Sequence, residues 1–219
     1  TPFAAGPIVD GEPTAGGDEA ALVRCPHDLR MRLGTVRTAT PEQCAAAVGS
    51  AVASQHGWDQ LGGGKRGDIL DKAADLMERD RARLMAVIVR EGGKTLDNAL
   101  GDVREAVDFL RYYAREARRL FATPLNLKGV TGERNTIELR GRGAFVCIAP
   151  WNFPLAIFTG QVAAALAAGN TVLAKPAPQT PITAFLAIQL LHEAGVPANV
   201  LHLLTGGGAV GAALVKDPR

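Results

Sequence analysis

Apolar residues recur every three or four positions through much of the first half of the chain, the spacing of one buried face on an α-helix. The clearest stripe lies between Leu96 and Phe121 and consists of Leu100, Val103, Val107, Leu110, Ala114, Ala117 and Phe121. This stripe predicts one long helix over residues 96–121, packed on one side against the rest of the protein.

Shorter helices are predicted before the long one. Thr40 is a suitable N-cap, Pro41 suits the first helical position, and Gln43 completes a capping box. A second helix is predicted over about 66–79, and a third, starting near 81, should stop at the pair Gly92 and Gly93. We therefore predict an N-terminal helical layer over residues 21–121.

The first 20 residues are rich in Gly, Pro and Ala and show little periodicity, so they predict a loose tail. Residues 122–142 contain an extended stretch in which Thr136, Ile137 and Leu139 favour a strand, which indicates a hairpin. The two segments flank the helical layer.

Strand and helix patterns alternate from Gly143 onward. The segments "AFVCI", "TVLAK" and "VLHLL" predict strands, separated by helices over about 154–168 and 181–194. This alternation predicts an α/β fold with a parallel sheet and helices on both faces. We assign residues 143–219 to the first half (βαβαβ) of a Rossmann-like, doubly wound dinucleotide-binding domain.

Composition narrows the class of partner. The chain has 219 residues, 47% of them hydrophobic and 21% charged, with a net charge of +2. A net charge this close to zero does not favour binding to nucleic acid. No apolar run reaches the roughly 18 residues of a membrane helix. The three cysteines (Cys25, Cys44 and Cys147) are widely spaced. They predict neither a metal site nor disulfides, and they fit a reducing, cytoplasmic location.

Ligands of doubly wound sheets bind beyond the carboxyl ends of the strands. The three predicted strands end at "APWNFP", "KPAPQTP" and "TGGGAVG", which should line one crevice. The last segment places Gly206, Gly208 and Gly211 in a G-x-G-x-x-G pattern at the start of a helix. Such a loop either brings backbone N–H groups to a phosphate or serves as a plain connector.

Two polar residues stand at these strand ends. Lys175 is positioned to donate to a nucleotide ribose or phosphate, although an exposed lysine is more often a solvated charge. Asn152 lies in a rigid turn between two prolines and offers an amide donor to a developing oxyanion. Its alternative role is a hydrogen bond within its own turn.

Several of these segments resemble one family. "PWNFP", "LAAGNTVLAKPA" and "EGGKT" ahead of a long helix are similar to motifs of the aldehyde dehydrogenase superfamily. "ALGDVREAVDFLRYYA" resembles more narrowly the 1-pyrroline-5-carboxylate (L-glutamate 5-semialdehyde) dehydrogenase modules of bifunctional proline utilization A proteins. The resemblance implies a parent enzyme that oxidises L-glutamate 5-semialdehyde to L-glutamate with NAD.

The resemblance also assigns roles to residues. It implies that Asn152 is catalytic, as a donor to the substrate oxyanion, and that Glu105 and Phe153 contact the substrate. It implies cofactor contacts for Ile148, Ala149, Pro150, Trp151, Lys175, Gly208 and Gly211. Pro178 departs from the family, which usually has Glu there, and this weakens the expected preference for NAD over NADP.

The family's nucleophilic Cys and general-base Glu lie beyond residue 219, and the chain begins without Met. We therefore expect an N-terminal fragment that lacks the catalytic domain and is inactive alone. The parent is expected to be a homo-oligomer through the hairpin at 122–142, with a proline dehydrogenase module possible on the same chain. The alternatives are another semialdehyde dehydrogenase and a non-catalytic module that binds nucleotide or a partner.

Overall fold

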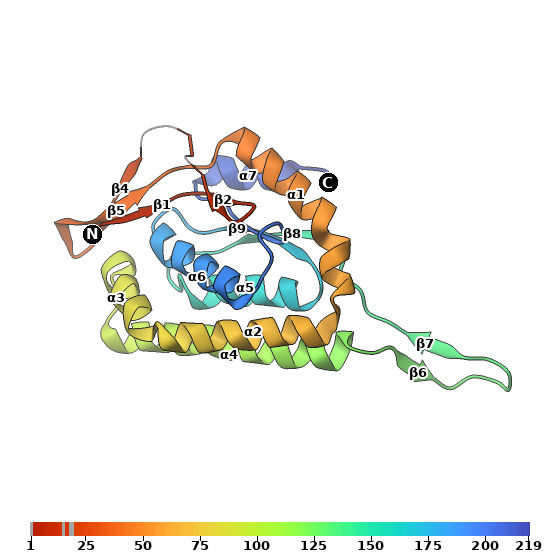
Figure 1. The fold of residues 1–219 in the computed structure, drawn as a ribbon. Helices are drawn as coiled ribbons and strands as arrows, with labels where there is room; N and C mark the ends of the chain where they lie inside the picture. Colours follow the sequence, from red (N-terminus) through yellow and green to blue (C-terminus); the bar gives the residue numbers. More distant parts are fainter. Residues whose placement is uncertain (1, 15, 18–19) are drawn as a thin grey trace.

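The computed structural model describes residues 2–14, 16–17 and 20–219. The helices are α1 (Pro41–Gln60), α2 (Gly62–Arg79), α3 (Arg81–Gly92), α4 (Leu96–Phe121), α5 (Ala156–Ala167), α6 (Pro181–Ala194) and α7 (Gly208–Lys216). The strands are β1 (Phe3–Ala5), β2 (Ile8–Val9), β3 (Glu12–Pro13), β4 (Ala21–Cys25), β5 (Asp28–Val36), β6 (Leu125–Leu127), β7 (Asn135–Ile137), β8 (Ala144–Ile148), β9 (Thr171–Lys175) and β10 (Leu201–Leu203). Figure 1 shows them in layers, with α2 and α4 along one side and α1 and α7 on the other.

The central sheet has the strand order β3-β2-β10-β9-β8. Strands β8, β9 and β10 run parallel, with α5 and α6 as the connections between them. This confirms the predicted α/β fold and its βαβαβ half. The side chains of β9 alternate between the two faces: Val172 and Ala174 belong to the core beneath α5 and α6, and Leu173 to the cluster beneath α1 and α7.

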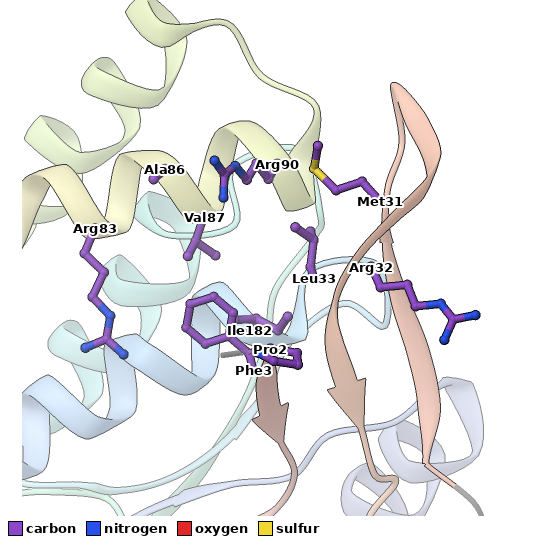
Figure 2. A pocket seen from close by; sticks show the side chains of 10 residues that line it. All are labelled: Pro2, Phe3, Met31, Arg32, Leu33, Arg83, Ala86, Val87, Arg90 and Ile182. Carbon is purple, nitrogen blue, oxygen red and sulfur yellow. The ribbon is translucent and has the colours of Figure 1, made fainter.

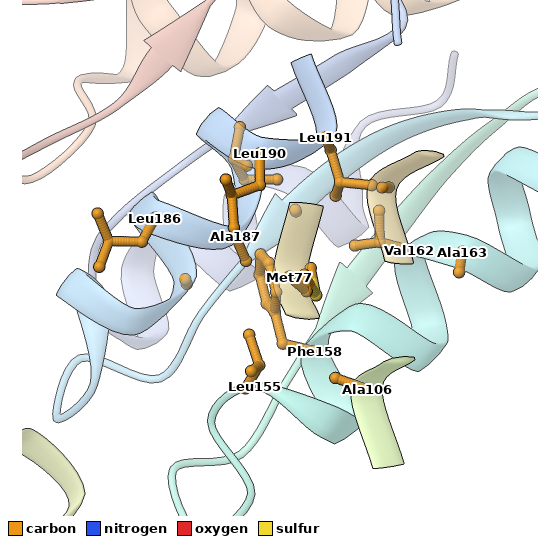
Figure 3. Close-up of a cluster of buried hydrophobic side chains, with 14 of the residues drawn as sticks. Met77, Ala106, Leu155, Phe158, Val162, Ala163, Leu186, Ala187, Leu190 and Leu191 are labelled. Atoms are coloured by element: carbon orange, nitrogen blue, oxygen red, sulfur yellow. The ribbon is translucent and has the colours of Figure 1, made fainter. Parts of the chain in front are cut away.

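The larger core lies between the sheet and the pair α2 and α4. Figure 3 shows Met77 of α2 and Ala106 of α4 against Phe158 and Val162 of α5 and the leucines of α6. Most of the predicted stripe on α4 is buried, with Leu100 and Phe121 only partly so. The long helix has the predicted bounds because its pattern is local and strongly periodic.

Helices α2 and α4 pack unusually close together. A Cβ atom added at Gly63 would overlap the backbone carbonyl of Ala117, and one added at Gly67 would lie 2.8 Å from the carbonyl oxygen of Ala114. The glycines at the start of α2 therefore belong to the helix, which begins at Gly62 rather than at the predicted 66. Close backbone approach is a use of glycine that outweighs its low helix propensity.

The prediction of a loose tail over residues 1–20 was wrong for Phe3–Pro13, which contain three short strands, and residues 1, 15 and 18–19 lie outside the described part. Strand β1 pairs in parallel with β5, and β2 joins the central sheet antiparallel to β10. The predicted helical layer was also wrong over its first part, where β4 and β5 form an antiparallel pair. The tail strands have two or three residues each, too few to show periodicity, and β1 and β2 have partners far away in sequence.

The predicted hairpin consists of β6 and β7, paired antiparallel, and it projects from the end of α4 (Figure 1). It carries exposed apolar side chains at Leu125, Leu127, Val130, Ile137 and Leu139. Among the helices that the structure describes, none has the length and apolar character needed to cross a membrane.

Candidate functional site

The carboxyl ends of β8, β9 and β10 meet at one edge of the sheet, as predicted. Ile148 pairs with Lys175 across β8 and β9, and Leu203 pairs with Ala174 across β9 and β10. The ladder continues past β8, because the amide of Ala149 donates to the carbonyl of Lys175 at 3.1 Å. The three loops that follow these strands are thereby held side by side.

Lys175 is not a solvated charge, because only 6% of its surface is exposed. Its Nζ donates to the carbonyl oxygens of Pro176 at 2.8 Å and Gly206 at 3.0 Å. Burial lowers the pKa of this ammonium group. Its side chain also passes close to Gly211, where an added Cβ would lie 3.4 Å from the lysine Cδ and Cε atoms. The structure thus joins Lys175 to the glycine-rich loop ahead of α7.

The G-x-G-x-x-G segment has the predicted context between β10 and α7. Gly206 has a φ of +148°, and the space beside its α-carbon is occupied by Val210 and Thr38. Gly208 opens the helix, and nothing lies within 4 Å of the position a Cβ would take there. The start of α7 is therefore open beside the buried Lys175, and Gly208 and Gly211 both lie near this strand edge.

The turn after β8 carries the predicted catalytic residue and its neighbours. Trp151 is 53% exposed and Phe153 40% exposed, whereas Ala149 is buried. Asn152 is exposed, and its side chain makes no hydrogen bond within the part of the chain that the structure describes. The bond to its own turn that a purely structural Asn would make is thus missing, and its amide remains available to a ligand.

A hollow of about 420 Å³ lies beneath this turn, against the first half of α4. Asn152, Phe153 and Glu105, three residues assigned to catalysis and substrate, line it together. The remaining lining residues are Lys94, Asp97, Asn98, Gly101 and Asp102. The predicted substrate residues are therefore gathered in one place although they are almost 50 positions apart in the chain.

Lys94 and Asp102 contribute to this hollow, and we assigned neither a role from the sequence. Asp102 is 1% exposed, and its Oδ1 accepts the amide of Ala156 at 2.8 Å while its Oδ2 accepts from Lys94 Nζ at 3.1 Å. Burial raises the pKa of the Asp102 carboxyl, against the opposing effects of Ala156 and Lys94. Asp102 lies at helical spacing between Ala99 and Ala106 on the buried face of α4, and a carboxylate at such an apolar-flanked position was the signal for it.

The Lys94 ammonium also lies 3.9 Å from the centroid of the Phe153 ring, a cation–π contact. Asp102 thus holds the start of α5 directly and Phe153 through Lys94. Since Asn152 directly precedes Phe153, the pair Asp102 and Lys94 fixes the end of the turn that carries the amide donor. Lys94 belongs to the "EGGKT" motif, but its contact with Phe153 joins segments far apart in the chain and could not be predicted from the motif.

None of the three cysteines offers a nucleophile to this site. Cys147 points into the core from β8, where burial raises its pKa to about 12, and burial also raises the pKa of Cys44. Cys25 is buried at the end of β4. The described residues contain no group of three or more His, Cys, Asp or Glu side chains placed to hold a metal ion.

A family model covers most of the chain: that of the aldehyde dehydrogenase family matches residues 14–219. The chain belongs to the aldehyde dehydrogenase family. Within this family it is 47% identical to the bifunctional protein PutA of Escherichia coli K12 over 95% of its own length, and 37% identical to a 1-pyrroline-5-carboxylate dehydrogenase of Anoxybacillus flavithermus over 97%.

Solved structures of aldehyde dehydrogenases agree with the fold. A 1-pyrroline-5-carboxylate dehydrogenase from Thermus with bound NAD matches 99% of the chain with a TM-score of 0.94 and 37% identity. The chain spans 42% of that enzyme, 41% of the Anoxybacillus relative and 15% of the Escherichia coli PutA protein. The chain is therefore less than half of each of these proteins.

Proposed function

We propose that the protein carrying this chain oxidises L-glutamate 5-semialdehyde to L-glutamate with NAD⁺. The observation that carries the proposal is the arrangement at one sheet edge. A free amide donor, Asn152, and an aromatic wall, Phe153, share a hollow with Glu105, and the buried Lys175 stands on the next strand. The 1-pyrroline-5-carboxylate dehydrogenases among its relatives support this choice of substrate.

The residues at the strand ends fit a dinucleotide. A lysine ammonium has three N–H donors, and Lys175 uses two of them on backbone carbonyls, which leaves one for a ribose hydroxyl. The open start of α7 at Gly208 suits a phosphate, and the missing side chain at Gly211 makes room for the lysine. Ile148, Ala149, Pro150 and Trp151 would form the remaining wall. The bound cofactor would supply hydride acceptance.

Asn152 acts on the carbonyl oxygen in this proposal. Its amide donates a hydrogen bond that strengthens as negative charge develops, a contribution of roughly 3 kcal/mol when the donor is held in place beforehand. Asp102 and Lys94 hold it, through the start of α5 and through Phe153. Glu105 and Phe153 bind the polar and apolar parts of the aldehyde.

We propose that the thiolate and the general base come from outside residues 1–219. The burial of Cys147 and Cys44 and their raised pKa values oppose thiolate formation, and Cys25 is fully buried at the end of β4. The chain alone should then give no aldehyde-dependent NADH. A cytoplasmic homo-oligomer built on the hairpin at 122–142, with a proline dehydrogenase module on the same chain, completes the proposal. The bifunctional PutA relatives support the second module.

The test is Asn152→Ala in the complete enzyme that contains this chain. We expect kcat to fall by about 10²–10³ with little change in KM, because the lost bond is strongest in the transition state. Asn199→Ala, an exposed asparagine just ahead of β10, is the matched control and should leave both constants unchanged. A change in KM alone would show that Asn152 contributes to binding and not to catalysis. A higher kcat/KM for a different semialdehyde would show that L-glutamate 5-semialdehyde is not the preferred substrate.

A further inference from the structure

A second pocket, of about 390 Å³, lies where β1 and β5 meet α3 (Figure 2). It shares no lining residue with the hollow beneath the Asn152 turn. Phe3, Leu33, Val87 and Ile182 present apolar side chains to it, contributed by two strands and two helices. Its size and apolar lining are those of small-molecule sites, in which a few polar groups fix the orientation of the ligand.

Three arginines line this pocket, and two of them, Arg83 and Arg90, lie on one helix. Figure 2 shows the side chain of the third, Arg32 of β5, directed away from these two. Arg83, Ala86 and Arg90 are spaced by three and four residues, so they lie along the same face of α3. Figure 2 shows the two arginine side chains on either side of Val87, with the ring of Phe3 below them. The small side chain of Ala86 leaves open the space between the arginines.

The positive charge of this pair is not neutralised by the protein. Neither Arg83 nor Arg90 forms an ion pair within 4 Å or a hydrogen bond to a carboxylate in the described parts of the chain. Asp80, near enough to feel the charge of Arg83, is hydrogen-bonded to Arg79, and Glu91 is turned toward α6. Arg83 instead stacks on Phe3, with its Cζ 5.9 Å from the ring centroid.

We propose that this pocket binds an amphipathic monocarboxylate, a medium-length unbranched acyl chain ending in a carboxylate. The acyl chain would lie on Phe3, Leu33, Val87 and Ile182. The carboxylate would lie at the rim between Arg83 and Arg90, because a guanidinium presents paired donors that match the two carboxylate oxygens. A guanidinium stacked on a ring keeps its N–H donors free at its edge, which suits Arg83 to this role.

The binding test uses octanoate as the probe and the complete enzyme that contains this chain, by titration calorimetry at low salt. We expect saturable binding, with 1-octanol and acetate at least tenfold weaker because each lacks one half of the ligand. The double variant R83Q/R90Q should weaken octanoate binding at least tenfold and 1-octanol binding little. Arg81→Gln, an exposed arginine of the same helix outside the pocket, is the matched control and should bind as wild type does.

Filling the pocket gives an independent test. Ala86 is exposed on α3, so Ala86→Phe should leave the circular dichroism spectrum unchanged while its ring occupies the acyl site. We expect it to abolish octanoate binding. The proposal is overturned if wild type shows no saturable binding, or if R83Q/R90Q binds octanoate as well as Arg81→Gln does. Unchanged binding by a folded Ala86→Phe variant would likewise overturn it.

Discussion

Replacing Glu91 by Gln should remove a specific pH dependence from the stability of the fold. Glu91 is 4% exposed at the end of α3 and joins that helix to the start of α6. Its Oε1 accepts the amide of Ile182 at 2.7 Å, and its Oε2 accepts the amide and hydroxyl of Thr183 at 2.8 and 2.6 Å. These bonds favour the carboxylate, but desolvation outweighs them and raises the pKa of Glu91 to about 7.

The size of the effect follows from that pKa. An unfolded chain restores Glu91 to its ordinary pKa of 4.5, so the folded state retains the proton over a range in which the unfolded state has released it. The contribution of Glu91 to stability is therefore fully present below pH 4.5 and is lost as the pH rises toward and through 7. Between about pH 5 and pH 8 the loss amounts to roughly 2.5 kcal/mol, since one pKa unit corresponds to 1.36 kcal/mol.

The assay is urea unfolding of the chain, followed by circular dichroism at several values between these limits. Glu91→Gln cannot titrate, so its free energy of unfolding should fall by about 2.5 kcal/mol less than that of wild type. It should also be less stable at pH 5, because the amide nitrogen cannot accept from Thr183. Glu133→Gln, in the exposed hairpin loop, should follow wild type throughout. Parallel pH curves for wild type and Glu91→Gln would refute a raised pKa at Glu91.

Three further changes test other parts of the structure. Pro178→Glu in the complete enzyme should raise the preference for NAD⁺ over NADP⁺ by about 1–2 kcal/mol, through hydrogen bonds to the ribose hydroxyls and repulsion of a 2′-phosphate; an unchanged ratio of kcat/KM values would place residue 178 away from the ribose. Asp102→Ala should lower the free energy of unfolding by about 3 kcal/mol, because Lys94 and the Ala156 amide lose their partner; a loss within 0.5 kcal/mol, roughly the range of an ordinary surface change, would contradict the described contacts. Gly63→Val should cost about 3 kcal/mol by forcing α2 away from Ala117, whereas Gly64→Val, where nothing lies near, should cost less than about 1 kcal/mol in the same measurement.

The sequence predicted those elements whose signals are local. The capping box of Thr40 and Gln43 is present with both of its hydrogen bonds, and α3 ends at Gly93 in the left-handed conformation. Strands β8 and β9 have their predicted bounds because each is a short apolar run enclosed by clear breaks. In these segments the residue types and their spacing are sufficient.

The misses have a common physical cause, which is pairing between residues far apart in the chain. Strand β2 is stabilised by β10, nearly 200 positions away, and two residues offer no periodicity to detect. The β4–β5 pair was missed although Leu29, Met31 and Leu33 alternate with arginines, a pattern that favours a strand. The candidate site was predicted at the strand ends, but the contact of Lys94 with Phe153 depends on how α4 packs against α5.

Helix α4 connects the hollow beneath Asn152 with the projecting hairpin. Its 26 residues extend about 39 Å, from the hollow beneath Asn152 at one end to the projecting hairpin of β6 and β7 at the other. Close backbone contact at Gly63 and Gly67 joins the second half of α4 to α2. A molecule that binds the hairpin and displaces it would therefore move α4 as a unit, and Asp102 with it. Mechanical load applied to the hairpin would then reach the Asn152 turn without passing through the sheet.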